Sequence, residues 1–310
     1  MNKKTSKKTL IFGSILFLGG IILLGFIEYR NYLSRKDQKE LIAQLITIDN
    51  TYNPQNNDKP VFISGLVQSE SDLIDSELRI RIPALHAERR VEMYQYFESV
   101  TTRQEKRGST GGTKEIKEYS YHTGWYGMVI DSEGFNNKNI KNPESFPYEN
   151  EYPITSNNAF IGDYKLSPKV LEKGPVEFKS TDFFVFNEEQ IQGVAVATER
   201  NAVSISESGR YLHIGTFDPE RSSIGTVRIS YSLVPSGEYS VIGKQNEKTI
   251  DEYVLSSGRV ISHMHTGNVS VEKIMESAVQ FSSIIFWVGR IFGILFLVSG
   301  VALIYRYRSA

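Results

Sequence analysis

The chain has 310 residues, of which 40% are hydrophobic, so it can bury one sizeable core or two small ones besides any membrane spans. This composition argues against disorder throughout. The formal net charge of −1 gives no field that would recruit nucleic acid, and no basic stripe is interleaved with aromatic residues, so nucleic acid is excluded as a partner. The absence of cysteine excludes disulfides, thiol chemistry and cysteine-ligated metal, so an exported domain must be stabilised by packing alone.

The first apolar segment is Leu10–Ile27, which carries no charge and has the length of about 17–25 residues that crosses a bilayer. The lysine-rich residues 1–9 before it would also suit a cleaved secretory signal, but Glu28-Tyr29-Arg30 follows without a small-x-small cleavage site. We therefore predict an uncleaved transmembrane helix at residues 10–27.

A second apolar segment covers residues 283–305 and is long enough to span the membrane if Arg290 lies near the interface. Two spans place both chain ends on one side of the lipid bilayer, and the basic residues near both ends indicate that this side is the cytoplasm. The predicted topology is a multi-pass protein with a basic cytoplasmic N-terminus at 1–9, an exported domain at 28–282 and a cytoplasmic tail at 306–310.

Small residues recur along both predicted spans. Gly289, Gly293 and Gly300 form a stripe on the second span, and Gly13 and Gly20 form a similar stripe on the first. Such stripes let helix backbones approach closely, so the spans could pack against each other or against a second copy. The alternative is that glycine is simply common in membrane helices.

The exported region predicts an α+β fold dominated by antiparallel strands. Residues 37–48 carry apolar residues at helical spacing, which predicts a short amphipathic helix just outside the membrane. Apolar and polar residues alternate over 224–234, and the turns and alternation that follow predict an antiparallel meander up to residue 265. A final helix is predicted from residue 271 towards, or into, the second span.

Two further segments of the exported region have more than one interpretation. Residues 131–158 are rich in Asn, Pro and Glu, and they predict either a long surface loop or a break between two subdomains. A basic group lies earlier in the chain, where a solvated strand face is the favoured explanation and a patch for anionic lipid is the alternative. This group consists of Arg79, Arg81, Arg89 and Arg90.

Two strands rich in aromatic residues are predicted at Val91–Val100 and Lys114–Ile130, joined by a glycine-rich loop into a hairpin. Alternation places aromatic side chains on one face of each strand, where cross-strand pairs add about 0.2–1 kcal/mol each. This face predicts either a half-buried sheet surface, the commoner origin because strands favour aromatic residues, or a platform for a ligand. The candidate interaction residues are Tyr94, Tyr96, Tyr119, Tyr121 and Trp125.

The sequence carries no convincing catalytic motif: it has no nucleophile elbow, phosphate loop, dinucleotide fingerprint or zinc-protease helix. His263 and His265 share one face of a predicted strand but lack a third ligand, so we predict no metal site and no cofactor. Ser270 has the S-x-x-K spacing of serine acyltransferases, but it stands where a helix N-cap belongs. We therefore predict no catalytic residues and no enzymatic activity.

The hairpin also carries a family resemblance. VEMYQY at Val91–Tyr96, followed by YSYHTGW at Tyr119–Trp125, resembles the LUMA family, the family of transmembrane protein forty-three. Two features depart from the family pattern: Ile140 stands near the place of an expected histidine, and the family's further C-terminal spans have no counterpart here. Similar segments follow in order along the chain at Phe135, Asn142-Pro143, Ala159–Ser167, Ile224–Val234, Thr266–Met275 and Trp287–Arg290.

The resemblance implies a non-enzymatic membrane scaffold that organises or stabilises membrane protein complexes, with self-association and other membrane proteins as partners. Eukaryotic members of the family are found in the endoplasmic reticulum and inner nuclear membrane. The cysteine-free, Lys- and Asn-rich composition here looks bacterial, so we expect the plasma membrane instead. The alternative functions are an envelope sensor or ligand-binding module acting through the exported domain, and an unrecognised membrane-anchored hydrolase.

Overall fold

The computed structural model describes residues 7–107, 112–174, 183–198, 202–218, 222–279 and 283–308. The chain divides into two compact units, of which unit 1 comprises Met1–Gly65, Ile161–Val176 and Glu238–Ala310, and unit 2 comprises Leu66–Phe160 and Glu177–Gly237. A strand-rich region lies between an N-terminal and a C-terminal apolar helix, which confirms the predicted α+β class. Residues 131–158, for which a long surface loop and a break between subdomains were the two predictions, lie wholly within unit 2.

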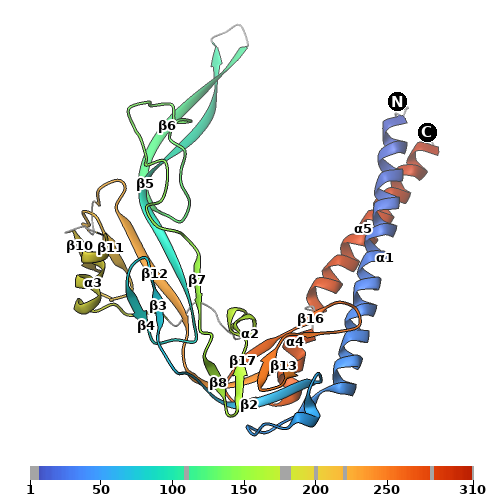
Figure 1. Ribbon diagram of the computed structural model, residues 1–310. Coiled ribbons are helices and arrows are strands. Elements are labelled where there is room, and N and C mark those ends of the chain that lie inside the picture. The colour runs from blue at the N-terminus through green and yellow to red at the C-terminus, as the bar shows by residue number, and fades with distance from the viewer. Residues whose placement is uncertain are drawn as a thin grey trace. The chain divides into compact units, whose positions relative to one another are not determined.

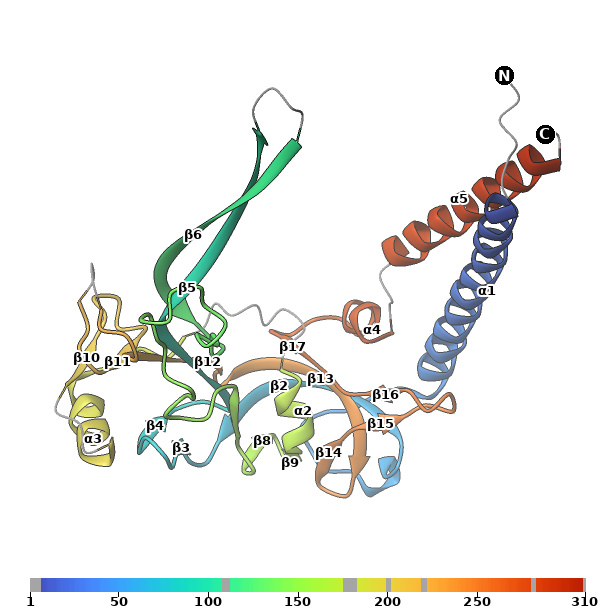
Figure 2. The ribbon, with the colours of Figure 1, turned by 90° about the horizontal axis from the view of Figure 1, so that it is seen from above.

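Two long helices stand out in unit 1: α1 (Lys7–Gln44) and α5 (Ser283–Arg308) lie side by side (Figures 1 and 2). The predicted amphipathic helix at 37–48 is not a separate element, because its first residues continue α1 and Ile46–Thr47 form strand β1. The final predicted helix is α4 (Val271–Val279), and its junction with α5 at 280–282 lies outside the described residues. The remaining helices of unit 1 are α2 (Pro168–Glu172) and the 3₁₀ turn η1 (Pro54–Asn56).

The main sheet of unit 1 runs, in the described part of the chain, in the order β1, β2, β8, β9, β14, β13 and β17. An additional pairing of β2 with β13 closes five of these strands into a ring. Strand β13 pairs with β14 and with β17 in antiparallel orientation, whereas β1 pairs with β2, and β9 with β14, in parallel. The bounds are β2 Pro60–Ser69, β8 Ala159–Ile161, β9 Tyr164–Leu166, β13 Gly237–Asn246, β14 Thr249–Asp251 and β17 His263–Thr266, with a separate hairpin of β15 (Tyr253–Val254) and β16 (Val260–Ile261).

A small hydrophobic core joins the end of α1 to this sheet. Leu41 of α1 is completely buried, and Ile274 of α4 packs in the same cluster. The other buried members are Phe62, Ile242, Leu255, Ile261 and Met275. Helix α1 is unbroken, so it runs from its apolar segment directly into the core of unit 1, where its last turns are packed.

The sheet of unit 2 has the order β10, β11, β12, β5 and β6 among the described residues, and β7 pairs with β5 on its own. Strand β12 was predicted to return into β13 as a meander, but the two strands belong to different sheets, so that prediction is wrong at this turn. Alternation specifies a strand and its buried face, whereas the neighbouring strand is chosen by tertiary packing. The bounds are β5 His86–Arg107, β6 Gly112–Tyr126, β7 Tyr152–Thr155, β10 Val203–Ile205, β11 Leu212–Ile214 and β12 Val227–Val234, with β3 (Leu73–Asp75), β4 (Ile80–Ile82) and helix α3 (Glu188–Thr198).

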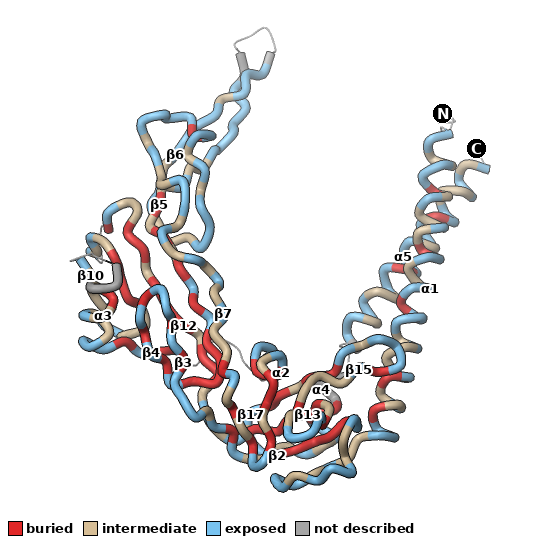
Figure 3. The backbone as a smooth tube through the Cα atoms, viewed as in Figure 1, coloured by how far each residue is buried: buried red, intermediate tan, exposed pale blue. Residues whose placement is uncertain are grey.

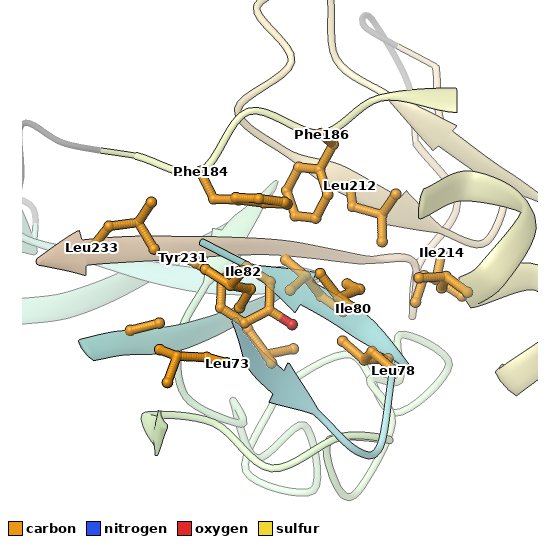
Figure 4. Packing of buried hydrophobic residues seen from close by; sticks show 14 of the residues in the cluster. Leu73, Leu78, Ile80, Ile82, Phe184, Phe186, Leu212, Ile214, Tyr231 and Leu233 are labelled. Atoms are coloured by element: carbon orange, nitrogen blue, oxygen red, sulfur yellow. The ribbon is translucent and has the colours of Figure 1, made fainter. Parts of the chain in front are cut away.

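The core of unit 2 lies where β12 and β5 face the β3–β4 hairpin and the segment before α3 (Figure 4). Phe184 and Phe186 meet edge to face, with ring centroids 5.1 Å apart, and both rings contact the buried Tyr231 of β12. Leu78, Ile80 and Ile82 fill the other side of the cluster and are almost completely buried. Burial of these apolar side chains stabilises unit 2 in a chain that has no cysteine for disulfides.

One member of the predicted solvated arginine face is in fact buried. Arg89 is 1% exposed, and its guanidinium donates two hydrogen bonds to Asp75, which is fully buried, at 3.0 and 2.7 Å. The hydroxyl of Tyr231 donates to the same carboxylate at 2.6 Å, and Glu77 completes the ion pairs of Arg89. The interpretation as a wholly solvated face was therefore wrong for Arg89, because its partner Asp75 comes from a separate hairpin.

Candidate functional site: a helix pair and a projecting hairpin

The two apolar helices touch through their backbones. A Cβ atom placed on Gly300 of α5 would lie 2.6 Å from the backbone nitrogen of Phe17 and 2.7 Å from the carbonyl oxygen of Gly13. A Cβ on Gly20 of α1 would lie 2.9 Å from the carbonyl oxygen of Gly293. Since carbon atoms prefer separations of about 3.5–4.0 Å, only glycine fits at these positions without a shift of the backbone.

The other predicted packing glycines of α5 face side chains of the same chain. Gly293 accommodates Leu24, whose branched end would be 2.6 Å from a Cβ, and Gly289 accommodates Ile27. By contrast, nothing lies within 4 Å of a Cβ placed on Gly19 or Gly25 of α1. The structure thus places Gly289, Gly293 and Gly300 together on the face of α5 that meets α1.

An ion pair closes this helix pair at one end of the apolar segments. The guanidinium of Arg290 donates two hydrogen bonds to the carboxylate of Glu28, at 2.6 and 3.1 Å, and it lies over the ring of Trp287 at 5.4 Å. A charged group near hydrocarbon is costly, and a bidentate carboxylate partner reduces that cost. Glu28 directly follows the apolar run Leu10–Ile27, so the pair is at the level expected for the membrane interface.

The predicted aromatic hairpin is formed by β5 and β6. Their antiparallel register sets Tyr94 opposite Trp125, Glu98 opposite Tyr121 and Val100 opposite Tyr119. All five predicted aromatic residues, including Tyr96 opposite Thr123, therefore point to one face. On this face of the described strands, the rings of Tyr94 and Trp125 meet edge to face with centroids 5.2 Å apart, and on the opposite face Phe97 stacks with Tyr126 at 6.2 Å.

Part of this face is covered by the loop at 131–158. Phe135 is buried against Tyr121, with ring centroids 5.9 Å apart. The hydroxyl of Tyr121 donates to Glu98 at 2.5 Å and accepts the backbone N–H of Asn137 at 2.8 Å. The side chain of Asn142 accepts the N–H of Tyr96 at 2.7 Å and donates to its carbonyl at 2.9 Å, as an additional strand would.

The outer part of the hairpin, which we call the arm (residues 99–107 and 112–120), has no such cover. Strand β12 pairs with β5 only as far as Met93, and the described pairings beyond it join β5 and β6 alone. The described side chains of the arm are exposed, except for the half-buried Ser99 and Ile116 (Figure 3). From Tyr94 to Arg107 the strand spans about 45 Å at about 3.3 Å per residue.

Sequence reasoning missed a cluster at the base of the hairpin. His213 of β11, only 2% exposed, stacks on Phe217 at 3.6 Å between ring centroids and lies 5.6 Å from the ring of Trp125. Burial, together with the guanidinium of Arg228, lowers the pKa of His213 to about 4. Arg228 itself pairs with Glu92 at 2.7 Å and lies over Trp125. The Nδ1 atom of His213 has no partner among the described residues.

The structure places the serine and the two histidines that were considered for catalysis or metal binding on different elements. Ser270 accepts the N–H of Lys273 at 3.4 Å just before α4, as its predicted N-cap role requires. His263 and His265 both lie on β17. Within the described ranges, no group of three or more His, Cys, Asp or Glu residues is placed to hold a metal ion.

Comparison with known proteins agrees with the family resemblance of the hairpin. A family model described as Transmembrane protein 43 matches residues 93–309. The chain belongs to this family. It is similar to Transmembrane protein 43 homolog of Drosophila melanogaster, with 27% identity over 300 residues that cover 94% of this chain and 75% of the relative. It is also similar to Transmembrane protein 43 of Homo sapiens, with 24% identity over 297 residues that cover 95% of this chain and 72% of the relative.

No solved structure matches the chain. Family membership and the two helices that are long and apolar enough to cross a bilayer make this a membrane protein of the Transmembrane protein 43 family. The matched region begins within the aromatic hairpin and includes the 131–158 loop, the arm and α5.

Proposed function

We propose that this protein is a non-enzymatic membrane scaffold that organises or stabilises membrane protein complexes through the arm. The observation that carries the proposal is a long two-stranded hairpin whose outer part, the arm, has edges that no described segment pairs. An isolated hairpin is marginally stable, and its edges present free N–H and C=O groups that can pair with a strand of another protein. Pairing with a strand of a partner would therefore stabilise the arm, and the arm has the free backbone groups that such pairing requires.

The composition of the arm suits a specific partner rather than general aggregation. Its exposed strands carry many charges, among them Arg103 and Glu118, which form a cross-strand ion pair at 3.1 Å. Charged side chains on edge strands oppose indiscriminate pairing. We place the arm and the rest of residues 28–282 on the exported side of the plasma membrane, with both termini in the cytoplasm.

The test is in-cell crosslinking and mass spectrometry of the full-length protein, compared with a variant without the arm. Replacing residues 99–120 by Asn-Gly joins Glu98 to Tyr121, which are already opposite each other, through a favoured two-residue turn. Reproducible membrane-protein partners that disappear in this variant support the proposal. Partners that persist without the arm, or a wild-type protein that crosslinks to nothing, contradict it.

A second variant separates recognition of the strand edges from recognition of side chains. Exchanging Arg103 and Glu118 (R103E/E118R) keeps the ion pair and the strand pairing but reverses the local charge pattern. Partners kept by this variant indicate backbone pairing, and partners lost from it indicate side-chain recognition. Either result is compatible with a scaffold that binds through the arm.

A pocket favours a second candidate function, an envelope sensor or ligand-binding module. Segment 129–144 encloses about 360 Å³ at the base of the hairpin, with Asp131, Lys138 and Asn142 among its walls. Charged and amide side chains in a partly apolar lining suit a small ligand that carries polar groups. Binding of a ligand by the folded full-length protein, abolished by alanine at Asp131 and Lys138, which line this pocket, would favour this function over the scaffold.

A further inference from the structure

A second pocket, of about 340 Å³, lies in unit 1 where α1 leaves its apolar segment. One wall is α1 between Arg30 and Asp37, and the other is the β15–β16 turn at Ser257–Arg259. The turn is held on α1 by Glu40, which accepts the backbone N–H of Ser256 at 2.8 Å and also its hydroxyl. The pocket is therefore formed by contacts within the protein, before any ligand is bound.

One of the residues that line this pocket has an incompletely paired carboxylate. Asp37 is 3% exposed, and its Oδ1 atom has no hydrogen-bond partner among the described residues. Its other oxygen is 3.9 Å from Nη1 of Arg259, which is an ion pair beyond hydrogen-bond distance. A buried carboxylate oxygen without a donor is unfavourable, so a donor from a ligand would be strongly retained here.

The position of the pocket along α1 points to the lipid headgroups. Arg30 follows Ile27 by three residues, which is about 4.5 Å along the helix axis. The headgroup region adds about 5–8 Å to the hydrocarbon core on each side, so Arg30 is within it. Asp37 is about 10 Å further along the axis, so the pocket extends from the headgroup region at Arg30 outward to Asp37, which lies beyond that region, and a headgroup in the pocket must extend away from the bilayer along α1.

We propose that this pocket binds the headgroup of a phospholipid that carries a primary ammonium group, as in phosphatidylethanolamine. The phosphate lies between Arg30 and Arg259, and the ammonium donates a hydrogen bond to Oδ1 of Asp37. A phosphatidylglycerol headgroup supplies no cation for Asp37, and the trimethylammonium of phosphatidylcholine has no N–H to donate. The pocket therefore selects ethanolamine over both, independently of the scaffold function.

The test uses the full-length protein, delipidated in detergent and incubated with phosphatidylethanolamine, phosphatidylglycerol or phosphatidylcholine, and native mass spectrometry counts the retained lipid. The wild type is expected to retain phosphatidylethanolamine at least tenfold more than either other lipid. Asp37→Asn is expected to abolish this preference, and Arg259→Gln to weaken retention of all three lipids. Arg35→Gln is the matched control for the loss of an arginine: Arg35 is an exposed residue of α1 that does not line the pocket, and the variant should bind like the wild type.

The opposite outcomes overturn the proposal. Wild-type protein that retains the three lipids equally, or Asp37→Asn that still prefers phosphatidylethanolamine, excludes the assigned role of Asp37. Displacement of the lipid by equimolar soluble glycerophosphoethanolamine identifies a site for a free solute and excludes the membrane lipid as the ligand. If thermal unfolding shows that Asp37→Asn does not fold, Arg259→Gln decides, and retention equal to that of Arg35→Gln contradicts the proposal.

Discussion

Replacing Gly300 by leucine should separate the two membrane helices. A Cβ at this position would be 2.6 Å from the nitrogen of Phe17, so α1 and α5 must part by about 1 Å to restore an ordinary contact of about 3.5 Å. A gap of about 0.5–1 Å forfeits about a quarter to a half of each dispersion contact along the seam. Overpacking of this kind costs about 1–3 kcal/mol, which lowers the ratio of paired to unpaired helices about 5–150-fold.

Spin labels can measure this separation without touching the seam. The chain has no cysteine, so cysteines at Ile15 and Val301, which are 60% and 52% exposed, provide the only two labelling sites. Double electron–electron resonance on the full-length protein in lipid nanodiscs should give one narrow distance distribution for the otherwise wild-type chain. In Gly300→Leu the distribution should broaden and gain a population at longer distances.

The matched control is Gly19→Leu, because a Cβ at Gly19 meets nothing within 4 Å. This variant adds the same side chain to the same helix pair on a face that is open, so its distance distribution should match that of the parent. A Gly300→Leu distribution that superimposes on the parent would refute the argument that the glycine seam sets the approach of α1 and α5. An equal change in Gly19→Leu would refute it as well, because the effect would then not depend on the seam.

Three other predictions follow from charged and titratable groups. Asp75→Asn leaves the buried guanidinium of Arg89 without its ionised partner, so the free energy of unfolding should fall by about 3–5 kcal/mol. The loss should be measured as a lower Tm, and the double variant D75N/R89M should recover part of it. The pKa of His213 is about 4 in the folded protein and 6.5 in the ordinary imidazole, so between these values the unfolded chain binds a proton that the folded protein does not. The free energy of unfolding should therefore fall by up to about 3 kcal/mol as the pH is lowered from 6.5 to 4. In His213→Phe that part of the decline in Tm should vanish. Glu28→Gln should broaden the spin-label distances between α1 and α5, and the exchange E28R/R290E should narrow them again.

Hydropathy located the two apolar helices, because a bilayer requires a long uncharged run. It did not show where α1 ends. Residues 28–44 contain neither glycine nor proline, so no residue interrupts the helix when the sequence turns polar, and the predicted separate helix at 37–48 is partly the end of α1. The ion pair between Glu28 and Arg290 could not be predicted from the sequence either, since its partners are 262 residues apart.

Alternation and aromatic content predicted the β5–β6 hairpin, because its strands are neighbours in the sequence and a local turn joins them. The face that it presents depends on distant segments. Asn142 pairs with Tyr96 across 46 residues, and Asp75 accepts from Tyr231 across 156 residues. Sequence periodicity carries no information on such pairs, so neither the burial of Arg89 nor the packing of the 131–158 loop over Tyr121 could be predicted from the sequence.

The occupied glycine seam bears on how this protein could assemble with others. Gly289, Gly293 and Gly300 already meet α1 of the same chain, so a second copy could use these faces only by displacing that helix. Displacement would forfeit the backbone contacts at Gly300 and expose Arg290 without Glu28, which is unfavourable near hydrocarbon. Self-association, if it occurs through the spans, must therefore use their outer faces, where Gly19 and Gly25 are open. The arm, by contrast, has strand edges that no described segment pairs, so recruitment of a partner there costs no contact already formed.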